Sequence, residues 1–248
     1  MIISRDEWLK YIEQLSKIDQ MAGALMDNYI QTHGFDDENI LDFAYGLSTK
    51  YGEASGALAA EWYDEIARRS GKTLPPAEVA DTAEFDEVAK AVNGTKKTGN
   101  PKLVANSVSR LVKRTGADTT LRNAKRDGAE WAWIPNGDTC AFCLTLASNG
   151  WQPASREQIY GGHAEHIHAN CDCTFAIRFD NDTRYQGYNP AKYQAMYDAA
   201  AEADDVGMRS KDIINYMRRQ NYAANKDAIN AQKRIAYAER KLRQEQNG

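Results

Sequence analysis

The sequence predicts a mainly α-helical protein with a small β-containing module, which is an α+β fold class. Three observations predict it. Apolar residues recur every three or four positions through most of the chain, two short segments alternate apolar and polar residues, and all four cysteines lie between residues 140 and 173. With 248 residues and 42% hydrophobic content, the chain is long enough to fill one large core or two smaller ones.

Residues 1–72 are predicted to form an N-terminal helical region. One apolar stripe of helical spacing covers residues 5–31, a second pattern covers 40–51, and a third covers 54–66. We therefore expect an array of antiparallel helical hairpins. The aromatic residues on these stripes are expected in the core, since aromatic side chains at this spacing bury large apolar areas.

Residues 73–100 are expected to form a linker with loops, because prolines, glycines and an acidic stretch interrupt the helical pattern. Residues 101–130 resume the pattern and are expected to form two helices that lead into the next segment. Asn100-Pro101 supplies a cap and a first residue for one helix, which should end near Gly116. Asp118 is expected to cap the second helix.

Residues 131–182 form the Cys/His module, which combines short strands with every cysteine and three of the four histidines. Residues 131–134 and 174–179 alternate as short strands do. Between them lie Cys140-Ala-Phe-Cys143 and His168-Ala-Asn-Cys171-Asp-Cys173. Two cysteine pairs separated by about 25 residues have the ligand spacing of a structural zinc site, in which the metal replaces a core too small to hold the loops.

We therefore expect one structural zinc ion bound by four protein ligands. The candidate ligands are Cys140, Cys143, His168, Cys171 and Cys173. The sequence does not rank Cys171 against Cys173, or His168 against His163 and His166. The alternatives are cysteines that pack as small apolar residues and cysteines that form disulfides. The chain starts without a basic and apolar signal segment, which favours synthesis in a reducing cytosol and metal over disulfide.

A catalytic zinc site is the competing interpretation. His163-Ala-Glu165 matches the His-x-Glu of zinc deaminases, but here the Cys-x-x-Cys precedes it, and Thr139 stands where a proline is expected. In a zinc-dependent nucleic-acid-processing enzyme, such as a nuclease-like effector, His163 and His166 would act as base or phosphate ligand. The sequence contains no His-Glu-x-x-His, P-loop or Gly-x-Ser-x-Gly motif. We therefore favour a structural site without catalysis.

Residues 183–248 are expected to form C-terminal helices that end in a basic tail. Net charge alternates along the chain, from −10 in residues 1–92 to +6 in 93–130, −6 in 131–206 and +6 in 207–248. A long polar helix needs a partner or stays loosely attached, and nucleic-acid phosphate or an acidic protein surface would serve as the partner. No run of about 18 apolar residues occurs, so no membrane span is expected.

The Cys/His module resembles a known family. Residues 131–150, which read Trp-Ala-Trp-Ile-Pro-Asn-Gly-Asp-Thr-Cys-Ala-Phe-Cys-Leu-Thr-Leu-Ala-Ser-Asn-Gly, are followed by His168-Ala-Asn-Cys171-Asp-Cys173. This pattern is similar to the phage Mu F-like minor head proteins, and in particular to the minor capsid proteins of tailed phages of Gram-positive bacteria. The match covers about residues 118–180. Asp172 departs from the commoner family form, which has a basic residue there, and a carboxylate would repel phosphate.

The resemblance implies a structural minor capsid protein that acts in head morphogenesis and has no enzymatic activity. It implies assembly in the host cytoplasm, a place in the virion at the capsid interior or the portal vertex, and an oligomer in the particle. The implied partners are the portal protein and the major capsid protein, with packaged DNA as a further partner for the basic C-terminal helix. No membrane partner is implied.

Overall fold

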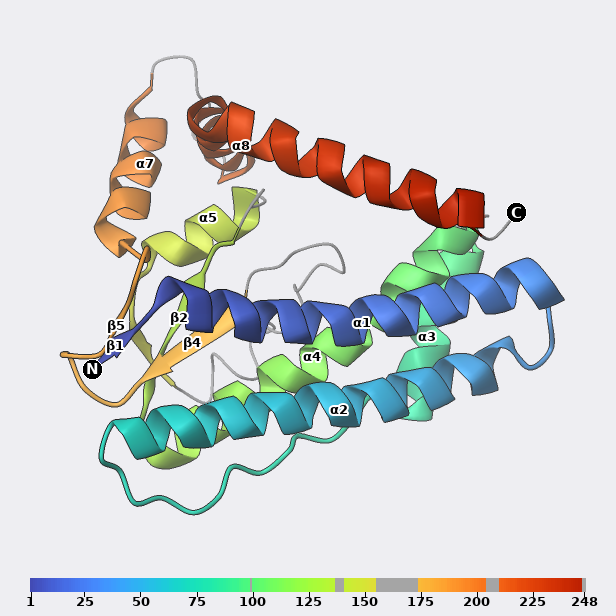
Figure 1. Ribbon diagram of the computed structural model, residues 1–248, viewed down its shortest axis with the longest axis horizontal. Coiled ribbons are helices and arrows are strands. Elements are labelled where there is room, and N and C mark those ends of the chain that lie inside the picture. The colour runs from blue at the N-terminus through green and yellow to red at the C-terminus, as the bar shows by residue number, and fades with distance from the viewer. Residues whose placement is uncertain (99, 137–140, 155–173, 204–209, 247–248) are drawn as a thin grey trace. The chain divides into compact units, whose positions relative to one another are not determined.

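The fold is taken from a computed structural model (Figure 1). The structure describes residues 1–98, 100–136, 141–154, 174–203 and 210–246. These residues are mainly helical with two small sheets, which confirms the predicted α+β fold class. The chain forms two compact units. The first unit contains residues 1–133 and 151–188, and the second contains residues 134–150 and 189–248.

Three long helices make the body of the first unit. They are α1 (Arg5–His33), α2 (Ile40–Arg69) and α4 (Pro101–Asp127), and a shorter helix, α3 (Phe85–Lys96), follows α2. Helix α4 packs against both α1 and α2, while α3 packs against α2 and α4 (Figure 1). Met26, Ile40 and Leu111 are fully buried among them, so the core is built from the apolar stripes that the sequence predicts.

Helices α2 and α4 are each continuous, whereas the sequence predicts two shorter helices in each place. The glycine that suggests the break in α4 is a site of close approach. A Cβ on Gly116 of α4 would lie 2.6 Å from the Ser55 Oγ and 3.2 Å from the Ser55 carbonyl oxygen of α2. Asp118 lies inside α4 and pairs with Arg114 at 3.6 Å, so it does not cap a helix. The prediction of a break near Gly116 was wrong because glycine also serves helix contact.

The expected linker 73–100 contains helix α3, and the segment before this helix is bonded to α4. The Glu78 N–H donates to Asn123 Oδ1 at 3.0 Å, and the Asn123 amide donates back to the Glu78 carbonyl at 2.8 Å. Helix α3 forms because Val88 and Val92, one turn apart, are both fully buried. Two apolar residues are a weak helical signal in a sequence rich in acidic and small residues.

Two small sheets lie in the fold. Strand β1 (Ile2–Ile3) pairs in parallel with β5 (Arg184–Tyr185). The other sheet has the order β3-β2-β4, made from β3 (Gln152–Pro153), β2 (Glu130–Ile134) and β4 (Thr174–Arg178). Strands β2 and β3 are antiparallel, with Trp131 opposite Gln152. The strands predicted at 131–134 and 174–179 are thus confirmed to within one residue at each end.

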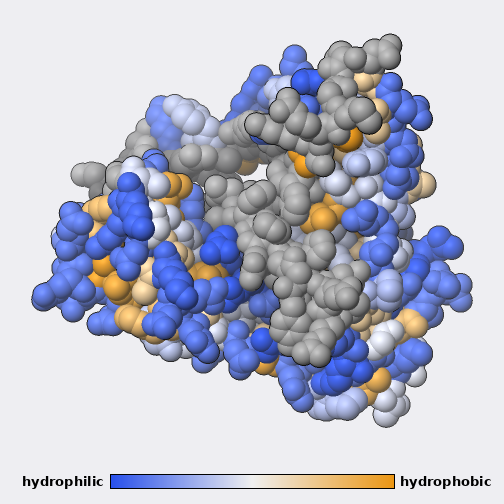
Figure 2. Space-filling model, turned by 180° about the vertical axis from the view of Figure 1, so that it is seen from behind, coloured by the Kyte–Doolittle hydropathy of each residue, from blue (hydrophilic) through white to orange (hydrophobic). Residues whose placement is uncertain are grey.

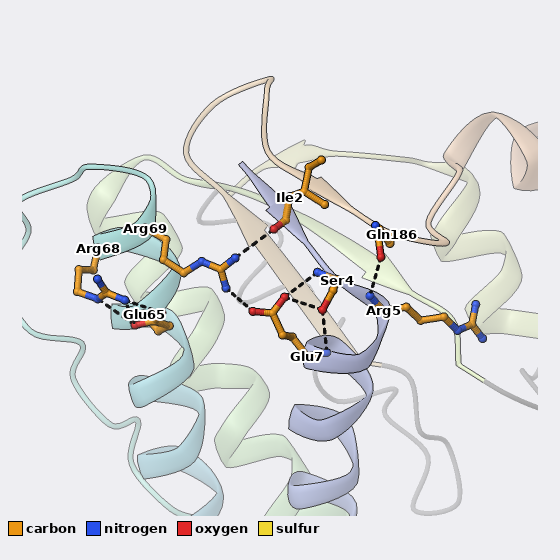
Figure 3. A network of polar contacts seen from close by, with 8 residues as sticks. All are labelled: Ile2, Ser4, Arg5, Glu7, Glu65, Arg68, Arg69 and Gln186. Atoms are coloured by element: carbon orange, nitrogen blue, oxygen red, sulfur yellow. Dashed lines mark hydrogen bonds and ion pairs between the residues drawn. The ribbon is translucent and has the colours of Figure 1, made fainter.

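A polar network ties the amino terminus to the rest of the first unit (Figure 3). Ser4 caps α1 and forms a capping box with Glu7, and the Ser4 hydrogen bonds, together with Arg69, hold the pKa of the Glu7 carboxyl below its usual value. Arg69 of α2 contacts the Glu7 carboxylate at 2.8 Å and donates to the Ile2 carbonyl at 3.1 Å. The first backbone N–H of α1 donates to Gln186 Oε1. The network therefore joins β1, α1, α2 and the segment after β5.

The second unit is helical in its described part. It contains α5 (Ala141–Ser148), α7 (Pro190–Glu202) and α8 (Ser210–Gln246). The Asn189 side chain caps α7, and Pro190 is its first residue. The small core of this unit consists of Leu144, Ala200, Ile213 and Met217, with Tyr193, Met196, Tyr197 and Tyr216 packed against it. The aromatic side chains of α7 therefore dock on a core.

Gly116→Ala should destabilise the first unit by about 1–3 kcal/mol, because the added methyl group meets the Ser55 carbonyl and forces α2 and α4 apart. Gly46→Ala in α2 is the matched control, since a Cβ there meets no atom within 4 Å. It should be neutral or stabilise by up to about 1 kcal/mol through helix propensity. Urea unfolding followed by circular dichroism measures both. Equal effects of the two substitutions would contradict the close approach of α2 and α4.

Candidate functional site

The predicted zinc ligands lie mostly outside the described residues. Cys140, His168, Cys171 and Cys173 fall there, as do His163 and His166. Cys143 is described and lies in α5, where its side chain is 2% exposed. Among the residues that the structure describes, no group of three or more His, Cys, Asp or Glu side chains could hold a metal ion. The zinc site therefore stays a prediction.

The surroundings of Cys143 fit a closed site. Cys143 lies in the first turn of α5, and Leu144 and Ala147 beside it are buried as well. Backbone N–H groups in a first helical turn favour negative charge, and the thiolate is the form of cysteine that binds zinc. Burial of Cys143 is compatible with a structural zinc site, and it equally suits a thiol packed as a small apolar group.

The two segments that carry the predicted ligands are connected to neighbouring strands, because β2 precedes Cys140 and β4 begins directly after Cys173. Arg178 Nε at the end of β4 donates to Glu130 Oε2 at the start of β2, at 2.6 Å. This ion pair indicates that β2 and β4 are antiparallel. The end of β2 then lies beside the start of β4. Both segments are therefore attached to the same end of this sheet.

Buried aromatic packing stabilises this strand pair. The Phe175 ring lies 4.6 Å from the Trp133 ring and 5.0 Å from the Trp131 ring, both edge to face. Phe175 and Trp133 are 1% and 2% exposed, so the pair is buried. The Arg178 guanidinium also lies 4.8 Å from the centre of the Trp151 ring. Sequence reasoning missed the Arg178–Glu130 ion pair, whose only signal is opposite charge at the ends of the two alternating segments.

A groove of about 270 Å³ lies between α1 and α4 beside Gly23. Its polar lining comes from Gln20 and Asp27 of α1 and from Lys102 and Asn106 of α4. These side chains offer hydrogen bonds and charges of both signs. Ser109 also lines the groove, and its hydroxyl donates to the Asp19 carbonyl oxygen at 2.9 Å, so the lining is suited to polar binding.

Helix α8 presents basic side chains to solvent. Exposed basic residues on it are Arg218, Arg219, Lys226, Arg234 and Lys241. This distribution agrees with the basic tail predicted for residues 183–248. The described surface in Figure 2 is largely hydrophilic, with hydrophobic residues in small separate patches on that face. Within the described ranges, no helix combines the length and apolar composition that a membrane crossing requires.

The long helices and the small sheets, one of which contains the strands β2 and β4 on either side of the predicted zinc ligands, define an α+β protein with a helical body. The model of the VG15 protein family matches residues 2–200. The chain therefore belongs to the VG15 family, which is a family of viral, phage-related proteins. No curated protein and no solved structure matches the chain.

Proposed function

We propose that this chain is a minor capsid protein of a tailed phage, of the phage Mu F-like type, which acts in head morphogenesis. The observation that carries the proposal is the VG15 family match over residues 2–200, because it makes the chain a viral protein. The likeness of residues 131–150 and 168–173 to minor head proteins supports the finer assignment. The proposed location is the capsid interior or the portal vertex.

The proposed partners are the portal protein and the major capsid protein, with packaged DNA as a further partner of α8. The exposed basic residues of α8 support an acidic partner, since phosphate or a carboxylate-rich surface would neutralise them. No reaction is assigned to the chain in this role. Its contribution is to carry the Cys/His module and the exposed basic side chains of α8.

The proposed cofactor is one structural zinc ion in the module of residues 131–182. Four of Cys140, Cys143, His168, Cys171 and Cys173 would hold it. The anchoring of both segments on the neighbouring strands β2 and β4 supports this assignment, and the burial of Cys143 is compatible with it. The metal would stabilise loops that the small sheet cannot hold by apolar packing alone.

Protein purified from a reducing cytosol should contain about one zinc per chain, and a strong chelator should lower its melting temperature by several degrees. Cys143→Ala should lose zinc, because it removes one thiolate. His33→Ala is the matched control, since His33 is an exposed histidine on α1, and it should keep the metal. Metal analysis and thermal unfolding measure these outcomes. Zero zinc with unfolding that the chelator does not change would remove the zinc proposal.

Substitution of His163 and His166 together separates the structural from the catalytic interpretation. A structural site should keep its metal and folding, and the purified chain should show no phosphodiesterase activity with any divalent metal. An activity that disappears in this double variant would instead identify a zinc-dependent nucleic-acid enzyme.

Particles of the phage that encodes this chain provide the direct test of the head function. Quantitative mass spectrometry should detect the chain at few copies in procapsids or virions, and a nonsense mutation in its gene should yield defective heads. The readout is electron microscopy of the mutant lysate. Normal heads from the mutant, together with absence of the chain from both kinds of particle, would contradict the proposal.

A further inference from the structure

The face of α8 that closes the core of the second unit continues along the helix without cover. Ile213 and Met217 on this face are 9% and 0% exposed, because residues of α5 and α7 pack against them. Four apolar residues further along lie within about 60° of Met217 on the helix, at 100° per residue. They are Ala224, Ala231, Ile235 and Ala238. All four are exposed, and the Ile235 side chain is 60% exposed.

The spacing of this face is that of a coiled coil. Met217, Ala224, Ala231 and Ala238 recur every seven residues, and Ile235 lies between the last two at the 3–4 spacing of a heptad. A sustained seven-residue repeat suits a second helix that winds along the first. The alanines leave room for the second backbone to approach closely, and Ile235 supplies a larger apolar side chain to fill a gap between helices.

The opposite face of α8 is polar and basic. Arg219, Lys226 and Lys241 are exposed there, together with Tyr237, whose side chain is 70% exposed. These residues lie more than about 110° away from Met217 at 100° per residue. The helix is therefore amphipathic far beyond the core of the second unit, and its partner must offer an apolar face.

Charge at the edge of the apolar face points to a second copy of the same helix. Asp227 and Arg234 are both exposed, and both flank the apolar face on the same side. When two α8 helices run antiparallel about a centre between Asn230 and Ala231, Asp227 of each helix faces Arg234 of the other. The same alignment leaves Ala224 only two residues, about 3 Å along the axis, from the level of Ile235 of the other helix, so a small residue lies near a large one. A two-fold, isologous contact repeats each interaction, so this ion pair occurs twice.

We propose that α8 pairs with α8 of a second copy in an antiparallel coiled coil. The contact covers about residues 221–240, which is about 30 Å of helix at 1.5 Å per residue. Asp227–Arg234 pairs fix its direction and alignment. The basic face, including Arg219 and Lys226, points away from the contact. This pairing is independent of zinc and of the head function, so its failure would leave both of those tests unaffected.

Sedimentation velocity of the full chain, from about 1 to 100 μM and after nuclease treatment, should show a reversible dimer. Ile235→Asp should raise the dimer dissociation constant at least tenfold, about 1.4 kcal/mol, because it places a charge in the apolar contact. Tyr237→Asp is the matched control on the opposite face and should change the constant less than about twofold. Circular dichroism should show unchanged helix content in both variants.

A charge swap tests the direction of the helices. Asp227→Arg and Arg234→Asp should each weaken the dimer several-fold, and the double variant should recover most of the affinity because it restores opposite charges. A chain that stays monomeric at about 100 μM, or that dimerises only with nucleic acid, would overturn the proposal. Equal effects of Ile235→Asp and Tyr237→Asp, or no recovery in the double variant, would overturn it as well.

Discussion

The close approach of α4 to α1 and α2 is the constraint on which the first unit depends. Gly23 of α1 faces Ser109, Gly56 of α2 faces Thr119, and Gly116 of α4 faces Ser55. Small side chains let the backbone of α4 come close to those of α1 and α2, and α4 packs against both helices. Thr119 and Asn123 of α4 then bind the segment before α3. Strand β2 follows directly from the end of α4, so the position of α4 also fixes the strand that leads to the Cys/His module.

Polar groups inside this contact fix the alignment of the helices. Asp19 of α1 is 2% exposed and pairs with Lys113 of α4 at 3.2 Å, and the Ser109 hydroxyl donates to the Asp19 carbonyl at 2.9 Å. A buried ion pair adds little net stability, but separating its partners is costly. Any sliding of α1 along α4 would leave Asp19 or Lys113 buried without the other, and we infer that the pair selects one alignment.

The sequence predicted the elements whose signals are local. The apolar period of α1, the Asn100-Pro101 start of α4 and the alternation in β2 and β4 all led to confirmed elements. It failed where a residue has a tertiary role, because Gly116 looks like a helix end until its contact with Ser55 is known. The Arg178–Glu130 pair joins strands distant in sequence, so local patterns could not predict it. Of the predicted zinc ligands, Cys143 alone lies in the described part, and the zinc site stays a prediction.

Amide hydrogen exchange under native conditions tests most directly whether α4 is the centre of the first unit. Backbone amides from Val104 to Ala124 should be the slowest to exchange in residues 1–133, at the rate set by global unfolding, because both neighbouring helices cover them. Amides near the ends of α1 and α2 should exchange faster through local fraying. Exchange of α4 that is faster than that of the middle of α1 and α2 would contradict its central role.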